Sequence, residues 1–263
     1  MAPEFRHVTD REAEAANRAD WDAEADSYQQ EHGDFLGDAR FVWSPEGLDE
    51  EELRLLGDVH GRRVLDLGCG AAQCARWLRT QGALAVGLDL SWRQLQHGRR
   101  IDEETSIPVP TVCGSALALP FADGSFHLVA SAFGALPFVV DIAVALREVR
   151  RVLVPGGRAA FSVVHPVRRM FPDDPTQAGM TITRSYFDRA AYVETADDGQ
   201  PSYVEPHHTV GDWVGAIGAA GLVLDQVLEP EWPPGHTRVW GGWGPVRAAM
   251  LPGTAIFVTR AAS

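Results

Sequence analysis

The sequence predicts an α/β fold in which a doubly wound, seven-stranded and mostly parallel sheet carries helices on both faces. Three observations predict it. Short apolar runs alternate with amphipathic stretches from about residue 60 to residue 164. The stretch Val64–Ala75 (VLDLGCGAAQCA) passes from an apolar run through a Gly-x-Gly turn into a helix-like pattern. The last two apolar runs have no crossover helix between them, so we expect the last strand to be antiparallel.

The first 59 residues are predicted to form a helical segment that covers the ligand site at the Gly-x-Gly turn. A helix is expected over 9–32, where Thr9 and Glu12 have the spacing of a capping box. Trp21 and Tyr28 lie seven residues apart and therefore share one helix face. Residues 33–47 are predicted as a loop and residues 48–58 as a second short helix.

The strands and helices of the sheet follow in order. We expect strands at Val64–Leu67, Leu84–Asp89, Val109–Cys113, His127–Ala132, Arg158–Val164, Leu222–Leu228 and Thr254–Thr259, and helices at Cys74–Gln81, Trp92–Arg100, Ile142–Leu153 and Val210–Ala220. Residues 60–263 thus form the main domain. Within it, residues 165–208 break the alternation and are rich in Pro, Asp, His and aromatic residues, which indicates an inserted substrate cap with β-like stretches near 181–186 and 191–194.

Composition excludes several classes of partner. The 263-residue chain has a net charge of −13 and no lysine. Most of the negative charge lies in residues 1–60, which hold 5 Arg against 17 Asp or Glu, a balance of 5 − 17 = −12. An acidic chain without a basic stripe is a poor ligand for nucleic acid or for an anionic membrane. The three cysteines form no disulfide framework, and no signal peptide or apolar span is apparent, so we expect a cytoplasmic protein.

The glycine turn carries the strongest functional signal. Gly68 and Gly70 remove Cβ atoms where a ligand is expected to approach the backbone. Asp66 ends the preceding strand, and Asp89 ends the next one, where a carboxylate suits the two hydroxyls of a ribose. A dinucleotide site would carry glycine where Gln73 stands, and Asp66 would repel a pyrophosphate. The same carboxylate favours an ammonium or a sulfonium, so S-adenosylmethionine is expected instead of a nicotinamide dinucleotide.

Four segments of the chain resemble the class I (Rossmann-like) S-adenosylmethionine-dependent methyltransferases. They are VLDLGCGAA (64–72), GLDLS (87–91), CGSALALPFADGSFHLVAS (113–131) and LREVRRVLVPGGRAAFS (146–162). The resemblance is firm over residues 60–165 and looser elsewhere. It implies methyl transfer from S-adenosylmethionine, which leaves S-adenosylhomocysteine, to an O, N or C atom of a small-molecule acceptor.

The resemblance also implies which residues hold the cofactor. Asp66, Gly68 and Gly70 would bind its methionine end and Asp89 its ribose. Leu90 would pack on the adenine, the segment 113–116 would line the adenine edge, and the segment 131–133 would lie under the methyl group. The implied cofactor-binding set is Tyr28, Asp66, Gly68, Gly70, Asp89, Leu90, Gln94, Gly114, Ser115, Ala116, Ser131, Ala132 and Phe133.

Three positions depart from the family pattern. Many members carry Asp where His127 stands at the start of its strand, and His127 is expected to be a surface or satisfied histidine and not a base. Many members carry Asp where this chain has Ser115, so the contact with the adenine amino group is expected to be weaker or to come from the backbone. Ala72 stands where a third small residue is usual, and it is accommodated without strain if its φ is negative.

His165 is the best candidate for a catalytic base, because it follows a strand at the carboxyl edge of the sheet. The alternative is a structural histidine at a strand end. His207 and His208 have no third ligand at a suitable spacing, so no metal site is predicted. The loop 229–252 carries three tryptophans that could line an acceptor cavity, pack against the cap or form a dimer contact. Two other functions remain open, a non-catalytic cofactor-binding module and a nicotinamide oxidoreductase. The protein is expected to be a monomer or a homodimer.

Overall fold

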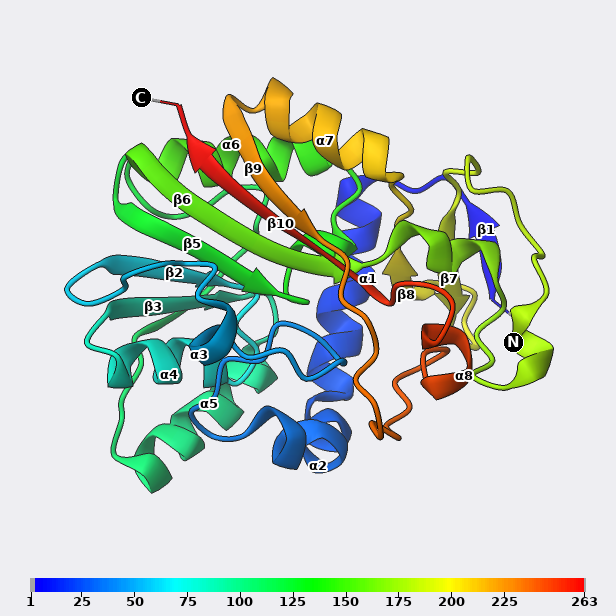
Figure 1. Ribbon diagram of the computed structural model, residues 1–263, viewed down its shortest axis with the longest axis horizontal. Helices are drawn as coiled ribbons and strands as arrows, with labels where there is room; N and C mark the ends of the chain where they lie inside the picture. Colours follow the sequence, from blue (N-terminus) through cyan, green and yellow to red (C-terminus); the bar gives the residue numbers. More distant parts are fainter. Residues whose placement is uncertain (1–2, 263) are drawn as a thin grey trace.

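A seven-stranded sheet with the strand order β4-β3-β2-β5-β6-β10-β9 forms the centre of the computed structural model, which describes residues 3–262 (Figure 1). Its strands are β2 (Arg63–Leu67), β3 (Leu84–Asp89), β4 (Thr111–Cys113), β5 (Phe126–Ala132), β6 (Leu153–Val164), β9 (Leu222–Leu228) and β10 (Thr254–Ala261). β10 runs antiparallel to both of its neighbours, and the neighbouring pairs from β4 to β6 are parallel. The predicted fold class is therefore confirmed.

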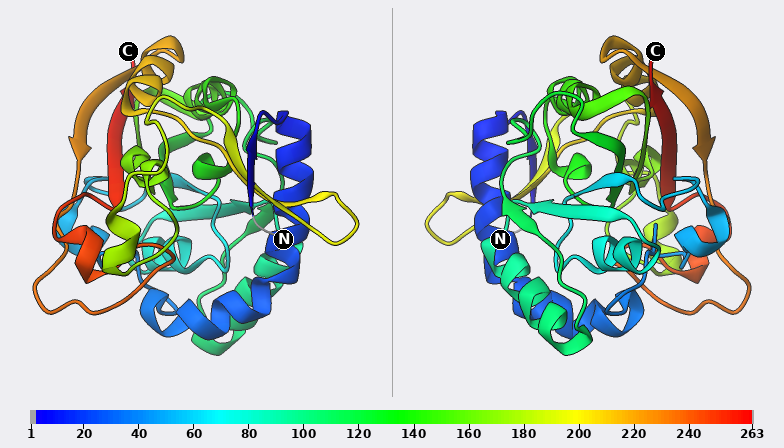
Figure 2. Two further views of the ribbon diagram at one scale, coloured as in Figure 1. Left: turned by 90° about the vertical axis from the view of Figure 1, so that its right-hand side faces the viewer. Right: turned by 90° about the vertical axis from the view of Figure 1, so that its left-hand side faces the viewer.

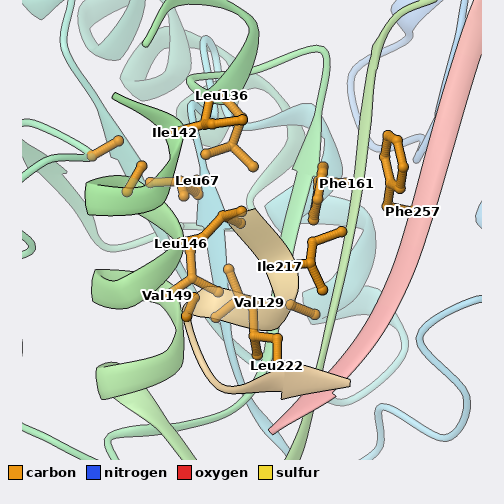
Figure 3. Packing of buried hydrophobic residues seen from close by; sticks show 14 of the residues in the cluster. Leu67, Val129, Leu136, Ile142, Leu146, Val149, Phe161, Ile217, Leu222 and Phe257 are labelled. Carbon is orange, nitrogen blue, oxygen red and sulfur yellow. The ribbon is translucent and has the colours of Figure 1, made fainter. Parts of the chain in front are cut away.

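Helices cover both faces of this sheet. They are α4 (Gln73–Thr80), α5 (Trp92–Thr105), α6 (Ile142–Val152) and α7 (Val210–Ala219). Successive residues of a strand point to opposite faces, so a central strand carries apolar residues on both faces. In β10, Phe257 belongs to the core under α6 and α7, whereas Ile256 and Val258 belong to the core under α4 and α5. Figure 3 shows the first of these cores, in which side chains from α6, α7 and the sheet interlock.

A second sheet joins the N-terminus to the insertion. β1 (Glu4–Arg6) pairs antiparallel with β7 (Ala191–Thr195), which pairs with β8 (Pro201–Glu205). The β7–β8 hairpin lies beside α1 (Asp10–Ala23), as both views of Figure 2 show. The buried Asn17 fixes this contact, because its amide donates to the Val204 carbonyl and accepts from the Val204 N–H, both at 2.8 Å. The insertion and the N-terminal segment thus form one layer.

Several predicted boundaries are wrong. The first helix is two helices, α1 and α2 (Ala25–Leu36), and α2 extends into the predicted loop. The second predicted helix shrinks to α3 (Glu50–Leu53), because Arg54 adopts φ 51° and ends it. The buried Glu50 carboxylate then accepts from the N–H groups of Leu55 and Leu56 at 2.9 and 2.8 Å.

Two smaller local predictions also differ from the structure. The Thr9 side chain caps α1, but the Glu12 carboxylate pairs with Arg6 at 2.6 Å, so the capping box is incomplete. The stretch 181–186 forms no strand, whereas 191–194 does. The remaining short elements are the 3₁₀ helices η1 (Leu136–Phe138), η2 (Pro166–Met170) and η3 (Gln177–Met180) and the helix α8 (Pro245–Ala248). Among residues 3–262, none of the helices combines the length and the apolar character needed to cross a bilayer.

Candidate cofactor site

A deep cavity lies at the carboxyl ends of β2, β3, β4 and β5, with about 1170 Å³ of empty space counted to its open mouth. Its floor, here called the cofactor floor, consists of the loops 66–74, 88–94, 114–117 and 132–135. Its other wall, here called the N-terminal cover, comes from α1, α2 and residues 36–42. The carboxyl edge of a parallel sheet is where ligands bind in α/β folds, because the connecting loops diverge there.

The cavity brings together twelve of the thirteen residues predicted to bind the cofactor. They are Tyr28, Asp66, Gly68, Gly70, Asp89, Leu90, Gln94, Gly114, Ser115, Ala116, Ala132 and Phe133. Ser131 is not among the lining residues. Ser131 precedes Ala132 on β5, so the two side chains point to opposite faces of the sheet. Ser131 is 1% exposed and its side chain is buried on the face away from the cavity. Binding by the twelve stays a prediction.

Asp66 and Asp89 form an acidic centre on adjacent strands. The Asp66 carboxylate is 2% exposed and accepts a hydrogen bond from the Ala75 N–H at 3.0 Å. Burial, with a smaller contribution from Asp89, raises the pKa of Asp66 to about 7. Asp89 accepts from the N–H groups of Gly70 and Ser91 at 2.7 and 2.8 Å, and burial raises its pKa as well. Two carboxylates in one buried cavity favour a cationic ligand with hydrogen-bond donors.

The two glycines of the turn have different roles. Gly68 has φ +75°, and a Cβ there would lie 2.1 Å from the Ala135 backbone nitrogen, so its absence lets two loops of the floor pack together. The space that the missing Cβ of Gly68 was expected to leave for a ligand is therefore occupied by the backbone of residues 134–135. A Cβ at Gly70 would meet nothing nearer than Gln94 Oε1 at 3.9 Å, so this glycine faces the cavity.

Two non-glycine residues of the floor adopt left-handed backbone conformations. Ala72 has φ +62°, contrary to the negative value expected for it, and Phe133 has φ +49°. Each conformation costs about 1 kcal/mol. Phe133 is held by its N–H, which donates to Ser162 Oγ at 3.0 Å, while Ser162 donates to the Trp43 carbonyl at 2.6 Å. Strained backbone of this kind is typical of binding loops.

The N-terminal cover meets the floor through glutamines and aromatic rings. Gln29 of α2 donates to Gln94 Oε1 at 2.8 Å and accepts from Gln73 Nε2 at 3.1 Å. Tyr28 and Trp21 both line the cavity and contact each other edge to face at 5.4 Å. Burial raises the pKa of Tyr28, so its phenol is neutral at physiological pH.

Sequence reasoning missed several cavity-lining residues of the cover. They are Asp10, Glu14, Asn17, Gln29, Leu36, Arg40 and Val42. Three polar or amphipathic residues, Glu14, Asn17 and Trp21, stand at positions i, i+3 and i+7 of α1 and therefore share one helix face. This cluster of polar residues on the helix face that carries Trp21 was the feature of the sequence that could have indicated that α1 lines a ligand cavity.

His165 lies outside this cavity, in a separate small one beside β6. Both of its ring nitrogens are engaged: Nε2 with Glu229 at 2.8 Å and Nδ1 as acceptor from the Val167 N–H at 3.2 Å. Burial lowers the pKa of His165, although Glu229 opposes the shift. The geometry favours the structural reading of this histidine, and its catalytic role stays a prediction. His207 and His208 bond the backbone carbonyls of Tyr186 and Val139.

The tryptophan-rich loop 229–252 packs against α2. The Trp240 ring stacks on His32 at 3.9 Å with an interplanar angle of 12°. The Arg238 guanidinium lies 4.4 Å from the Phe35 ring and donates to His32 Nδ1 at 3.2 Å. The loop thus packs against the N-terminal cover. Arg247 of the same loop also donates to the Asp174 and Gly179 carbonyls of the insertion, so the loop packs against the cap as well.

Comparison with known proteins agrees with this geometry. Residues 65–161 match the family model described as a methyltransferase domain. A demethylmenaquinone methyltransferase of Thermus thermophilus is 40% identical over 130 residues, which are 49% of this chain and 56% of the relative. A malonyl-[acyl-carrier protein] O-methyltransferase of Halorhodospira halophila is 34% identical over 64% of this chain and 51% of the relative. The chain spans about half the length of these curated relatives.

Solved structures show the same fold. An S-adenosylmethionine-dependent methyltransferase from Mesorhizobium loti superposes with a TM-score of 0.59 at 27% identity, over 79% of this chain and 94% of the other. A protein of the same description from Listeria monocytogenes superposes with a TM-score of 0.66 at 23% identity, over 81% and 97% of the two chains. The matched segment contains the Asp66 turn, Asp89 and the floor loops. Residues 65–161 therefore carry a methyltransferase domain, and the resemblance to the class I (Rossmann-like) S-adenosylmethionine-dependent methyltransferases is confirmed.

Proposed function

We propose that this protein transfers a methyl group from S-adenosylmethionine to an O, N or C atom of a small-molecule acceptor. The observation that carries the proposal is the buried Asp66 carboxylate, which has no ion-pair partner within residues 3–262 and lies one strand from Asp89. A buried carboxylate of this kind calls for a cation. The family relationship and the shape of the cavity support the same cofactor.

The residues present fit that cofactor. Asp66 would hold the ammonium of the methionine end. Burial raises the pKa of its carboxyl, so a positive charge beside it would stabilise the ionised form. Gly70 leaves open space at the turn. Asp89 retains lone pairs beyond its two backbone hydrogen bonds, so it can accept from both ribose hydroxyls. Leu90 and Leu117 supply apolar surface for a base.

When bound, the cofactor supplies an electrophilic methyl group on a positively charged sulfur. The contribution of the protein is mainly positioning, because the positive charge is only spread from the sulfur towards the acceptor in the transition state, and holding the two reactants in line accelerates such a step. Phe133 and its neighbour Gly134 hold the floor where β5 ends, and the N-terminal cover excludes water from above. We propose that residues 1–59 serve as this cover and that the insertion 165–208 supports it through β7 and β8.

Two other functions are less favoured. A nicotinamide dinucleotide would place its pyrophosphate against the Asp66 turn, where the buried carboxylates repel it. A non-catalytic cofactor-binding module remains a distinct hypothesis, which an activity assay separates from ours.

The assay measures acceptor-dependent formation of S-adenosylhomocysteine by mass spectrometry. Two curated relatives are named for demethylmenaquinone and for malonyl-[acyl-carrier protein], so the acceptor panel should contain both quinones and carboxylic acids. We expect S-adenosylhomocysteine above background with at least one class. Tight cofactor binding without turnover across the panel would instead support the non-catalytic module.

A further inference from the structure

The cofactor floor presents polar groups at three successive strand ends. In the parallel pairing, Asp66 of β2 lies opposite Gly87 of β3, and Asp89 of β3 lies opposite Cys113 of β4. Neighbouring strands are about 4.8 Å apart. A ligand whose ammonium lies at Asp66 and whose ribose lies at Asp89 therefore places its base beyond the end of β4, at Ser115.

Apolar side chains and one hydrogen-bonded polar pair lie at the end of β4. Leu90 and Leu117 line the cavity there. The Ser115 hydroxyl donates to Glu14 Oε2 at 2.5 Å and accepts from the Leu117 N–H at 3.1 Å. Its donor capacity is thus used on Glu14, whose carboxylate lines the same cavity. Glu14 is the carboxylate acceptor that lies beside Ser115 at this end of the cavity.

Glu14 has a fixed position although it belongs to the N-terminal cover. Arg18 donates to its second oxygen, Oε1, at 3.2 Å. At the far end of α1, Asp22 accepts from Ser91 Oγ at 2.7 Å and from the Arg93 N–H at 3.0 Å. The helix that carries Glu14 is therefore tied to the floor at the start of α5.

We propose that Glu14 recognises the nucleobase of the cofactor, its carboxylate accepting a hydrogen bond from the exocyclic 6-amino group of adenine while Ser115 orients it. The inference rests on the proposed cofactor. An ionised carboxylate accepts hydrogen bonds and cannot donate them, so it favours a 6-amino purine and repels a 6-oxo purine. The base is thus selected by the N-terminal cover, and base selectivity requires α1 to be docked on the floor.

The test is isothermal titration of S-adenosylhomocysteine and of its 6-oxo analogue, S-inosylhomocysteine. The wild-type protein should bind the adenosyl compound at least about tenfold more tightly, as expected for a hydrogen bond to a charged group. Glu14→Gln should reduce this ratio about tenfold, because an amide both donates and accepts. The double variant Glu14→Gln/Ser115→Asp moves the carboxylate from α1 to the floor and should restore the ratio.

Glu12→Gln is the matched control, since Glu12 lies on the same helix but pairs with Arg6. It should leave both affinities unchanged. A wild-type protein that binds S-adenosylhomocysteine with no preference between bases, or a Glu14→Gln protein that keeps the preference, would overturn the inference alone. A wild-type protein that does not bind S-adenosylhomocysteine would overturn the proposed function together with it.

Discussion

The cofactor floor and the N-terminal cover face the same cavity but are assembled over different distances in the chain. Asp66, Gly70 and Asp89 of the floor lie within a few residues of the ends of β2 and β3. The cover is held from far away: Arg238 contacts His32, 206 positions earlier, and Val204 bonds Asn17, 187 positions earlier. The floor therefore follows from local sequence patterns, whereas the cover depends on tertiary contacts. Each of the following predictions separates the contributions of the two regions.

The largest effect is expected at the ribose position of the floor. Asp89→Ala removes the carboxylate proposed to accept from two hydroxyls, and hydrogen bonds to a charged group contribute about 1.5–3 kcal/mol each. Affinity for S-adenosylhomocysteine should fall about 100-fold or more in calorimetry, with the fold retained by circular dichroism. Asp225→Ala is the control, because Asp225 pairs with Arg260 on the outer strands. Unchanged affinity in Asp89→Ala would refute the ribose assignment.

A second comparison lies within the floor. Gly68→Ala places a Cβ against the backbone of residues 134–135 at positive φ, and we expect it to lower the free energy of unfolding by about 3 kcal/mol. Gly70→Ala adds a Cβ in open space and should cost only about 1 kcal/mol, from its φ of +53°. Urea unfolding of the ligand-free variants measures both. Equal losses of unfolding free energy in the two variants would show that Gly68 is not required for the close packing of the two floor loops.

The buried Asp66 predicts a pH dependence for the floor. Its folded-state pKa of about 7 lies above the ordinary value of 3.8, so the ligand-free protein holds a proton that the unfolded chain has released. Stability from this group is complete below about pH 4 and is lost as the pH rises through 7. A cationic ligand needs the ionised form, so affinity for S-adenosylhomocysteine should fall up to about tenfold per unit below pH 7.

Calorimetry in buffers of different ionisation enthalpy checks this, since binding at pH 6 should release close to one proton. Asp66→Asn should bind more weakly and lose the proton release. A wild-type affinity that does not change between pH 6 and pH 8 would contradict the assignment of Asp66 to the ammonium.

The smallest effect is expected in the cover. Trp240→Ala removes the ring stacked on His32, and an aromatic pair contributes about 0.5–1.5 kcal/mol beyond its buried area. Dissociation of S-adenosylhomocysteine should become about three- to tenfold faster in surface plasmon resonance, because α2 is held less firmly over the cavity. Phe187→Ala serves as the control, since Phe187 is exposed, lies outside the floor and contacts Tyr186. The same dissociation rate in Trp240→Ala and wild type would show that the loop 229–252 does not hold the N-terminal cover over the cavity.

The sequence predicted those parts of the site that depend on residues at the end of a single strand. The succession of strands and helices along the chain, the Asp66 turn and the position of Asp89 follow from apolar runs and their flanking residues. The sequence did not show that Ser131 lies outside the cavity lining, because the face that its side chain takes depends on the register of the strand. It also did not show the contact between His165 and Glu229, because these residues meet only in the folded chain. Glu14, Gln29 and the stacking of Trp240 on His32 could not be predicted, since each depends on how separate helices and loops pack.

Binding of S-adenosylhomocysteine, measured by calorimetry side by side with NADH, tests the central claim most directly, because the charge at Asp66 and Asp89 is the reason for preferring one cofactor to the other. We predict micromolar or tighter binding of S-adenosylhomocysteine and no measurable binding of NADH. Tight binding of NADH, with none of S-adenosylhomocysteine, would contradict the account.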